Sequence, residues 1–279
     1  MTTFAIFEPA LRLGAFASVL IVLALWEVFA PRRQPAFPRA ARWPSNLALL
    51  AVDVIAVRVL VPGAAIAVAL AGETAGWGLL NAFDVAIWIA IPVAMVFLDL
   101  VLYFQHVMFH AVPTLWRLHR VHHSDLDIDV TTGTRFHPVE ILLSTAIKCA
   151  AVAAIGAPAL AVLAFEVLLN ATSMFNHANV NIPAGWDRAL RWFVVTPDMH
   201  RIHHSVEYNE SASNFGFNLP WWDYLLATYR ASPRLAHEAM TVGVDAFRAA
   251  EDLRIDRLLI QPFLDTPGRY PINRRQEVH

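Results

Sequence analysis

Residues 139–175 read VEILLSTAIKCAAVAAIGAPALAVLAFEVLLNATSMF, a long apolar run that is broken once, at Gly156-Ala157-Pro158. Each half is about 17 residues long, or roughly 25 Å of helix, which is slightly short for a hydrocarbon core of about 30 Å. Because glycine and proline interrupt helices, the run predicts a helical hairpin that turns at Gly156–Pro158. The hairpin is either a full double span or a shallow re-entrant pair.

Three further apolar runs precede the hairpin, at residues 13–30, 47–71 and 85–105. Each is long enough to cross a bilayer. The sequence therefore predicts an all-α integral membrane protein with about four transmembrane segments, the last of them the hairpin, and a cytoplasmic helical cap. We divide the chain into an N-terminal transmembrane region at residues 1–94, a catalytic domain at 95–230 and a polar C-terminal tail at 231–279. Within this tail, residues 244–259 are expected to form a short amphipathic helix.

The composition agrees with a membrane protein and excludes several other classes. Hydrophobic residues make up 57% of the chain and charged residues 16%, with a mean hydropathy of +0.47. The net charge is −2 and there is no basic block, which argues against a nucleic-acid partner. A single cysteine, Cys149, excludes a disulfide framework and any site built from several cysteines.

The loops between the apolar runs predict an orientation. Residues 31–42 carry Arg32, Arg33, Arg39 and Arg42, whereas residues 72–84 contain no Lys or Arg. Positively charged loops stay in the cytoplasm, so the 31–42 loop is expected inside and the 72–84 loop outside. All the histidine-rich segments then lie on the cytoplasmic side of what we expect to be a bacterial inner membrane.

Histidine is the unusual residue in this chain, because 10 of the 12 lie between positions 106 and 204. His106 and His110 form the first box, with helical i, i+4 spacing. Residues 119–124 read HRVHHS and residues 200–205 read HRIHHS, and these near-copies form the second and third boxes. Histidines at i, i+3 and i+4 fall on one helix face, so each box points its rings in one direction.

So many clustered imidazoles are expected to bind metal, because each buried ring nitrogen needs a partner that ordinary core packing does not supply. Neutral imidazole suits iron, copper, zinc and nickel, so the ligand type alone does not name the metal. Eight or nine ligands exceed what one ion takes, and two ions are therefore predicted.

The ordered set of boxes resembles the fatty acid hydroxylase / sterol desaturase superfamily of membrane di-iron oxygenases. The resemblance covers roughly residues 99–229 and includes the three boxes, RFHPVE at 135–140, NHAN at 176–179 and WWDYLLATY at 221–229. Members commonly have an arginine after the first box histidine, where this chain has Val107. This departure indicates a subfamily and weakens any transfer of substrate.

The resemblance implies two iron ions that activate dioxygen, with zinc as an alternative metal in the purified protein. It also implies a membrane lipid as the substrate, hydroxylated or desaturated at an unactivated C–H bond. Separate electron-transfer proteins are expected, since no dinucleotide-binding glycine motif or cysteine cluster is visible. The implied ligands are His106, His110, His119, His122, His123, His177, His200, His203 and His204.

Three other residues have two interpretations each. His137 is either a further ligand or a hydrogen-bond donor beside the site. Asp99 lies on the same helix face as His106, about 10 Å below it, and either holds a ligand histidine from another helix or makes a helix–helix hydrogen bond. Glu140 either holds a ligand histidine or is a carboxylate at the start of a helix, and Glu166 invites the same two interpretations.

The rival functions make different demands on the sequence. A zinc hydrolase would need a carboxylate base beside the ligands, as in H-E-x-x-H, and no box contains one. A haem protein needs single axial histidines rather than adjacent pairs. A non-redox metal carrier would not consume dioxygen. Five tryptophans are expected either in an interfacial aromatic belt or in ordinary packing of the cap: Trp116, Trp186, Trp192, Trp221 and Trp222. Five arginines are expected either to contact lipid phosphates or to face solvent: Arg117, Arg120, Arg188, Arg191 and Arg201.

Overall fold

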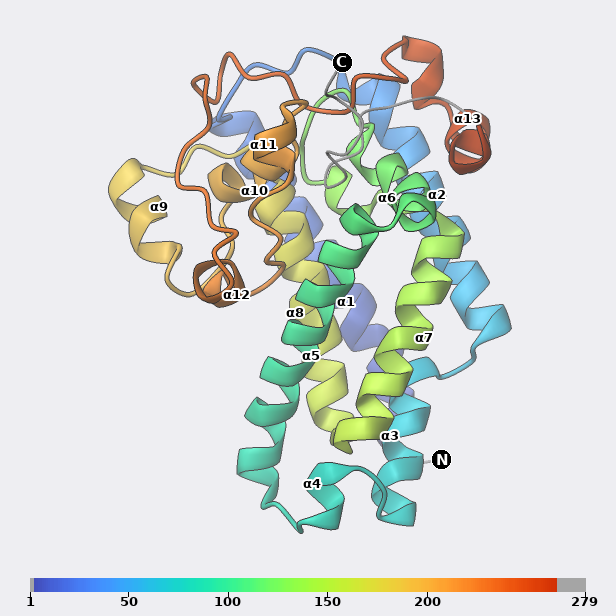
Figure 1. Ribbon diagram of the computed structural model, residues 1–279. Helices are drawn as coiled ribbons and strands as arrows, with labels where there is room; N and C mark the ends of the chain where they lie inside the picture. Colours follow the sequence, from blue (N-terminus) through green and yellow to red (C-terminus); the bar gives the residue numbers. More distant parts are fainter. Residues whose placement is uncertain (1–2, 265–279) are drawn as a thin grey trace.

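The computed structural model describes residues 3–264 and is built around a bundle of long apolar helices (Figure 1). Five stretches are long and apolar enough to cross a membrane: residues 8–29, 39–82, 87–111, 138–155 and 159–177. Together with the predominance of helix, they confirm the expected all-α integral membrane fold. The helices that form these stretches are α1 (Thr3–Phe29), α2 (Arg39–Leu60), α3 (Ala64–Ala75), α4 (Leu79–Ala82), α5 (Ile87–Ala111), α7 (Pro138–Ile155) and α8 (Ala159–His177).

The predicted hairpin is confirmed. Helix α7 ends at Ile155, Gly156 turns the chain with a φ of 71°, and α8 begins at Ala159. The turn also packs against another loop, because a Cβ added to Gly78 would lie 2.3 Å from the Cα of Gly156. Helix α8 is the most buried of the five spanning stretches, since 56% of its most apolar segment is buried inside the protein. It packs against α1, α3, α5 and α10 (Pro197–His203), so it joins the bundle to the histidine boxes.

The second spanning segment differs from its prediction as one run over residues 47–71. The structure divides it into α2 and α3, because Pro62 and Gly63 (φ 74°) interrupt the helix. Helix α2 also begins eight residues earlier than predicted, at Arg39. One face of its first turns is buried, since Arg42 and Asn46 bond to the loop that follows the second histidine box.

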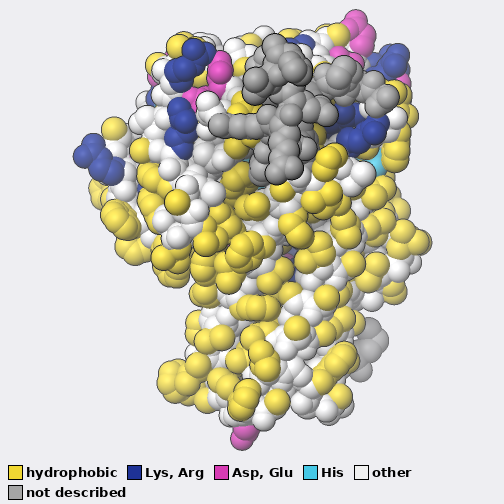
Figure 2. All heavy atoms as spheres, viewed as in Figure 1, with side chains coloured by type: hydrophobic (Ala, Val, Ile, Leu, Met, Phe, Trp, Pro, Cys, Tyr) yellow, Lys and Arg dark blue, Asp and Glu magenta, His cyan; other side chains and the backbone are white. Residues whose placement is uncertain are grey.

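The histidine boxes lie at one end of the bundle, in a cap that packs over α1, α2, α5 and α8. Figure 2 shows charged side chains gathered at this end and a mostly hydrophobic surface over the rest of the visible face. The opposite end holds α4 and the hairpin turn (Figure 1). The helices of the cap are α6 (Pro113–His123), η1 (Thr132–Thr134), α9 (Ala184–Leu190), α10, α11 (Tyr208–Ser211), α12 (Trp221–Leu225), η2 (Ala250–Leu253), α13 (Ile255–Ile260) and η3 (Gln261–Phe263).

The C-terminal segment also differs from its prediction. In place of one helix over residues 244–259, only η2 and α13 are helical there. The residues just before this segment bond to the cap: Gly243 N donates to His204 O at 3.0 Å, and Val206 N donates to Thr241 O at 3.1 Å. Within the segment, the backbone bonds are confined to short turns, such as Asp252 N to Ala249 O and Leu258 N to Arg254 O. Leu258 is fully buried against Leu49 and Val121. Residues 241–264 thus form a strap across the cap.

Candidate metal centre

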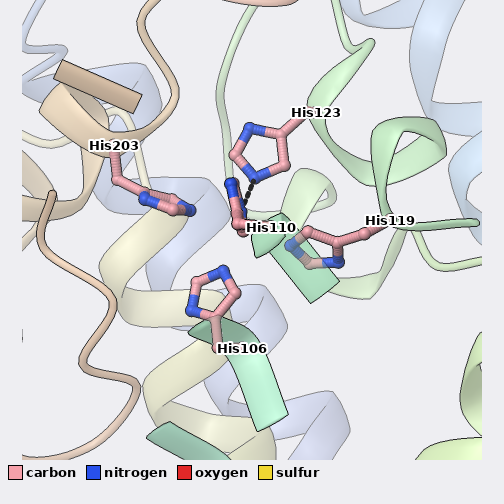
Figure 3. Close-up of side chains that lie close together, drawn as sticks. All are labelled: His106, His110, His119, His123 and His203. Carbon is pink, nitrogen blue, oxygen red and sulfur yellow. Dashed lines mark hydrogen bonds between the residues drawn. The ribbon is translucent and has the colours of Figure 1, made fainter. Parts of the chain in front are cut away.

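Nine imidazoles converge in the buried space between α5, α6, α8 and α10. They form two groups, and within each group the nearest ring nitrogens all lie within 4.8 Å of one another. The first group combines all three boxes, and Figure 3 shows its five rings arranged around a common centre. The first group is His106, His110, His119, His123 and His203, and the second is His122, His177, His200 and His204.

Three rings of the first group are oriented by acceptors behind them. His106 Nδ1 donates to Phe215 O at 2.8 Å, and His203 Nδ1 donates to Ser213 O at 2.8 Å. His119 Nδ1 lies 2.6 Å from Glu140 Oε1. An Nδ1 that faces a carbonyl or carboxylate oxygen must carry the ring proton, so Nε2 holds the lone pair. All three of these Nε2 atoms are buried without a hydrogen-bond partner.

The second group has the same arrangement. His177 Nδ1 donates to Ser173 O at 2.6 Å, and His122 Nδ1 donates to Arg135 O at 3.2 Å. The two Nε2 atoms are only 3.0 Å apart, yet neither has a proton to share. His177 Nε2 also lies 3.1 Å from Nε2 of His200 and 3.1 Å from Nε2 of His204.

These facing lone pairs fit a metal ion. Two nitrogens bound at right angles to one ion at about 2.1 Å are about 3 Å apart, and two on opposite sides are about 4.2 Å apart. The separations of 3.0–3.1 Å between neighbouring Nε2 atoms agree with the first of these spacings. Ligand histidines usually donate their other ring N–H to a carbonyl or carboxylate, as five of these rings do.

Burial keeps these rings neutral. The pKa of His119 is lowered to about 3 because the ring is desolvated. Burial, followed by the influence of neighbouring imidazoles, also lowers the pKa of each of the other cap histidines well below its usual range. Neutral imidazole is the form that binds metal. These other cap histidines are His122, His123, His200, His203 and His204.

Comparison with known proteins agrees with this geometry. Residues 91–228 match the model of the fatty acid hydroxylase family. Residues 91–228 therefore belong to the fatty acid hydroxylase family. This domain contains all nine grouped histidines and both sequence repeats.

Three curated relatives are lipid hydroxylases or monooxygenases by name. The ornithine lipid hydroxylase OlsE of Rhizobium tropici is 32% identical over 52% of this chain and 43% of its own length. An alkylglycerol monooxygenase of Xenopus tropicalis is 26% identical over 60% of this chain and 36% of its own length. A cholesterol 25-hydroxylase of Rattus norvegicus is 26% identical over 50% of this chain and 47% of its own length. The matches cover less than half of each relative. No solved structure matches this chain.

Within the fatty acid hydroxylase domain, the structure brings together the nine histidines named from the sequence but not His137. The Nδ1 of His137 accepts the Val139 N–H at the start of α7, and its Nε2 lies 3.1 Å from Leu259 O. Both ring nitrogens thus have partners away from the two groups. Glu140 fits both of its interpretations, because it lies in the first turn of α7 and its carboxyl group contacts His119. Glu166 does not approach the histidines, because it pairs with Arg12 and Lys148 inside the bundle.

Asp99 holds a loop rather than a histidine. Its carboxylate accepts hydrogen bonds from Asn218 Nδ2 and Trp222 Nε1, both at 2.7 Å, and from two backbone N–H groups. It bonds to no histidine ring. The bond from Trp222 joins α5 to α12, so Asp99 does make a helix–helix hydrogen bond, but to a helix of the cap rather than to another helix of the bundle. The loop that it holds continues from Phe215, whose carbonyl orients His106, so the effect of Asp99 on the site is indirect.

A buried ionic network supports the second box from behind. Arg42 is 1% exposed and donates to both oxygens of Asp125, at 2.7 and 2.8 Å, and to Asp129 at 2.7 Å. Arg135 donates to Val121 O and Ser124 Oγ, and its own carbonyl orients His122. Burial alone would raise the pKa of Asp125, but the guanidinium groups of Arg42 and Arg135 hold it well below its usual range.

This network was not predicted from the sequence, because Arg42 belongs to the arginine-rich segment at 31–42 and was interpreted only as a marker of membrane orientation. A signal was present in the alternating acids of DLDID at residues 125–129, directly after the second box. An acidic run beside a ligand cluster in an apolar chain requires buried cations, and Arg42 and Arg135 supply them.

The network yields a test of how the site is held. Asp125→Asn should lower the thermal midpoint of the detergent-solubilised protein strongly, since breaking a buried ion pair costs about 3–5 kcal/mol. Asp256→Asn is the control, because Asp256 forms an exposed pair with Arg254. Exposed pairs contribute about 0–1 kcal/mol, so its midpoint should barely move. Thermal unfolding is followed by circular dichroism. Equal midpoints for the two variants would contradict a structural role for the network.

Proposed function

We propose that this protein is a membrane-bound di-iron oxygenase that hydroxylates a C–H bond of a lipid. The observation that carries the proposal is the set of nine buried imidazoles whose ring nitrogens converge in two groups. Five of these rings present Nε2 to their group because an oxygen atom lies against their Nδ1. Membership of the fatty acid hydroxylase family supports it, as do relatives named for the hydroxylation or monooxygenation of lipids.

Iron is the metal that best matches this ligand set and family. The imidazoles alone would also accept zinc, but zinc has no redox chemistry. Two ions follow from the two groups, since five and four nitrogens each suit one ion. When bound, the metal pair would supply the dioxygen activation that cleavage of an aliphatic C–H bond requires, using electrons delivered by external donors.

The residues of this chain have positioning and exclusion roles. Backbone carbonyls of Phe215, Ser213 and Ser173 accept Nδ1 protons and fix the ring directions. Glu140 performs the same role for His119 and strengthens the basicity of that ring. Phe215 and Phe136 pack against the histidines and exclude water from the two groups.

The proposed reaction balances as a lipid C–H bond plus dioxygen, two electrons and two protons giving a lipid alcohol plus water. The two electrons come from separate electron-transfer proteins. The lipid enters from the bilayer beside the cap. The three relatives are named for an ornithine lipid, an alkylglycerol and cholesterol, so these lipids form the first panel of substrates to test.

We further propose that the cap faces the cytoplasm of a bacterial cell, where reduced electron donors are available. The arginine-rich 31–42 loop lies at the cap end and supports this orientation. The test uses Thr74→Cys and Ala250→Cys in a Cys149→Ala background, because both positions are exposed, at opposite ends. With an impermeant thiol reagent on intact cells, position 74 should react and position 250 should not. The reverse pattern would overturn the orientation.

The metal content of purified variants tests the two groups separately. We expect about two ions per chain in the native protein, and fewer in both His203→Ala, from the first group, and His122→Ala, from the second. Each substitution opens a site that relies on its full ligand set. His237→Ala is the matched control, because His237 is buried but lies in neither group. Elemental analysis showing full metal in both ligand variants would contradict the assignment.

Labelled dioxygen tests the reaction. With iron, a reductant system and the lipid panel, the product should carry one hydroxyl oxygen from ¹⁸O₂, detected by mass spectrometry. His106→Ala and His204→Ala should abolish turnover, because these two boxes are separated in sequence yet contribute to one assembled centre. Label from water alone would indicate a hydrolase. A new double bond without retained oxygen would identify desaturation.

A further inference from the structure

Two short helices at the side of the cap expose large apolar side chains. We call residues 184–193 and 217–226, which contain α9 and α12, the aromatic lobe. Six of its large hydrophobic side chains are between 41% and 73% exposed, although they lie outside the five spanning stretches. They are Trp186, Trp192, Phe193, Trp221, Leu225 and Leu226.

The two parts of the aromatic lobe form one unit. Trp221 Nε1 donates to Trp192 O at 2.8 Å, and the Tyr224 hydroxyl donates to Arg191 O at 3.0 Å. The rings of Trp192 and Tyr224 stack with their centres 5.6 Å apart. The exposed apolar surface is therefore presented on a braced element rather than on a loose loop.

The aromatic lobe has little exposed charge. Asp187 pairs with Arg191 at 2.7 Å, and Asp223 is fully buried, accepting the N–H groups of Phe215 and Gly216. Arg188 is left as the exposed charge among these described residues. An apolar aromatic surface with a basic residue at its edge is the composition that suits a lipid interface.

The depth of the lobe follows from its bonds to α5. Trp222 Nε1 donates to Asp99, and Thr228 Oγ1 lies 2.8 Å from the Tyr103 hydroxyl. Asp99 precedes His106 by seven residues, or about 10 Å along the helix. Helix α12 therefore lies beside a part of α5 that is itself in the bilayer, below the histidines.

We propose that the aromatic lobe is immersed in the interfacial region of the leaflet on the histidine side, with the bilayer itself as its partner. Helix α12 appears beside the middle of the bundle in Figure 1, well below the charged end of the cap. In Figure 2, hydrophobic side chains on this side of the cap continue without a break onto the bundle surface below.

This proposal also sorts the aromatic and basic residues expected at the interface. Trp186, Trp192 and Trp221 are exposed on the lobe, whereas Trp116 is buried against His110 and His123. The expectation of lipid-phosphate contacts fails for Arg120 and Arg201, which are buried and donate to Gln261 O and to Asp198.

Immersion of the lobe would have a consequence for the site, and this consequence rests on the proposed function. Asp223 on α12 binds the backbone of Phe215, and Phe215 O orients His106. The same element that contacts lipid would thus hold a ring of the metal centre at the bilayer surface. The membrane placement itself needs no assumption about the reaction.

Spin labels test the placement directly. Single cysteines at Phe193 and Leu225, in the full chain with Cys149→Ala, are labelled with a nitroxide in liposomes of stated composition. Val96 on the lipid-facing side of α5 and Ala250 on the cap are the controls, since both are exposed. The accessibility of each label to oxygen and to a water-soluble nickel complex is then compared.

The proposal expects positions 193 and 225 to lie between positions 96 and 250, with a ratio of oxygen to nickel accessibility several-fold higher than at position 250. Nickel accessibility equal to that at position 250 would place the lobe in water and overturn the proposal. Exclusion of both reagents, with spin–spin broadening, would indicate contact with a second copy and would also overturn it. If either variant fails to fold, labels at Trp186 and Leu226 give the same comparison.

Discussion

The arrangement of the cap depends on one electrostatic constraint, which is that imidazole lone pairs are directed at one another in a buried space. His122 and His177 each commit their Nδ1 proton to a carbonyl, and their Nε2 atoms then face each other at 3.0 Å. Lone pairs at this distance repel unless a cation lies between them. A metal ion bound by each of the two histidine groups would supply that cation.

The constraint explains why the cap is so densely bonded. Each ligand ring needs an acceptor behind it, and several of these acceptors are backbone carbonyls on loops. The loops are in turn held by buried carboxylates: Asp125 is bonded to Arg42, and Asp223 fixes the segment that carries Phe215. The strap at residues 241–264 closes the cap by bonding to the backbone of His204 and Val206. The positions of the histidine rings therefore depend on charged residues and chain segments that are distant in the sequence.

The sequence was sufficient for the elements whose cause is local. Apolar length predicted the spanning helices, and Gly156 and Pro158 predicted the hairpin turn. Thr196, directly before Pro197, is a local signal of the same kind, and its side chain caps α10 by accepting the Met199 N–H. The spacing of the boxes identified eight of the histidines that the structure groups, and the family resemblance added the ninth, His177.

The remaining features depend on long-range partners that periodicity does not encode. His137 became a helix cap because a neighbouring N–H and Leu259 O occupied both of its nitrogens. Asp99 accepts hydrogen bonds from Asn218 and Trp222, which lie more than a hundred residues away in the sequence. Residues 244–259 were expected to form one helix, yet only η2 and α13 are helical there, and Leu258 packs against Leu49 and Val121, which lie far away in the sequence.

X-ray absorption at the iron edge of iron-loaded protein tests most directly whether this histidine centre binds metal. With two groups of five and four imidazoles, the spectrum should show a first shell of about four to five nitrogens per ion at about 2.1 Å, with the outer-shell scattering of imidazole rings. A first shell dominated by oxygen or sulfur, without imidazole scattering, would contradict the account.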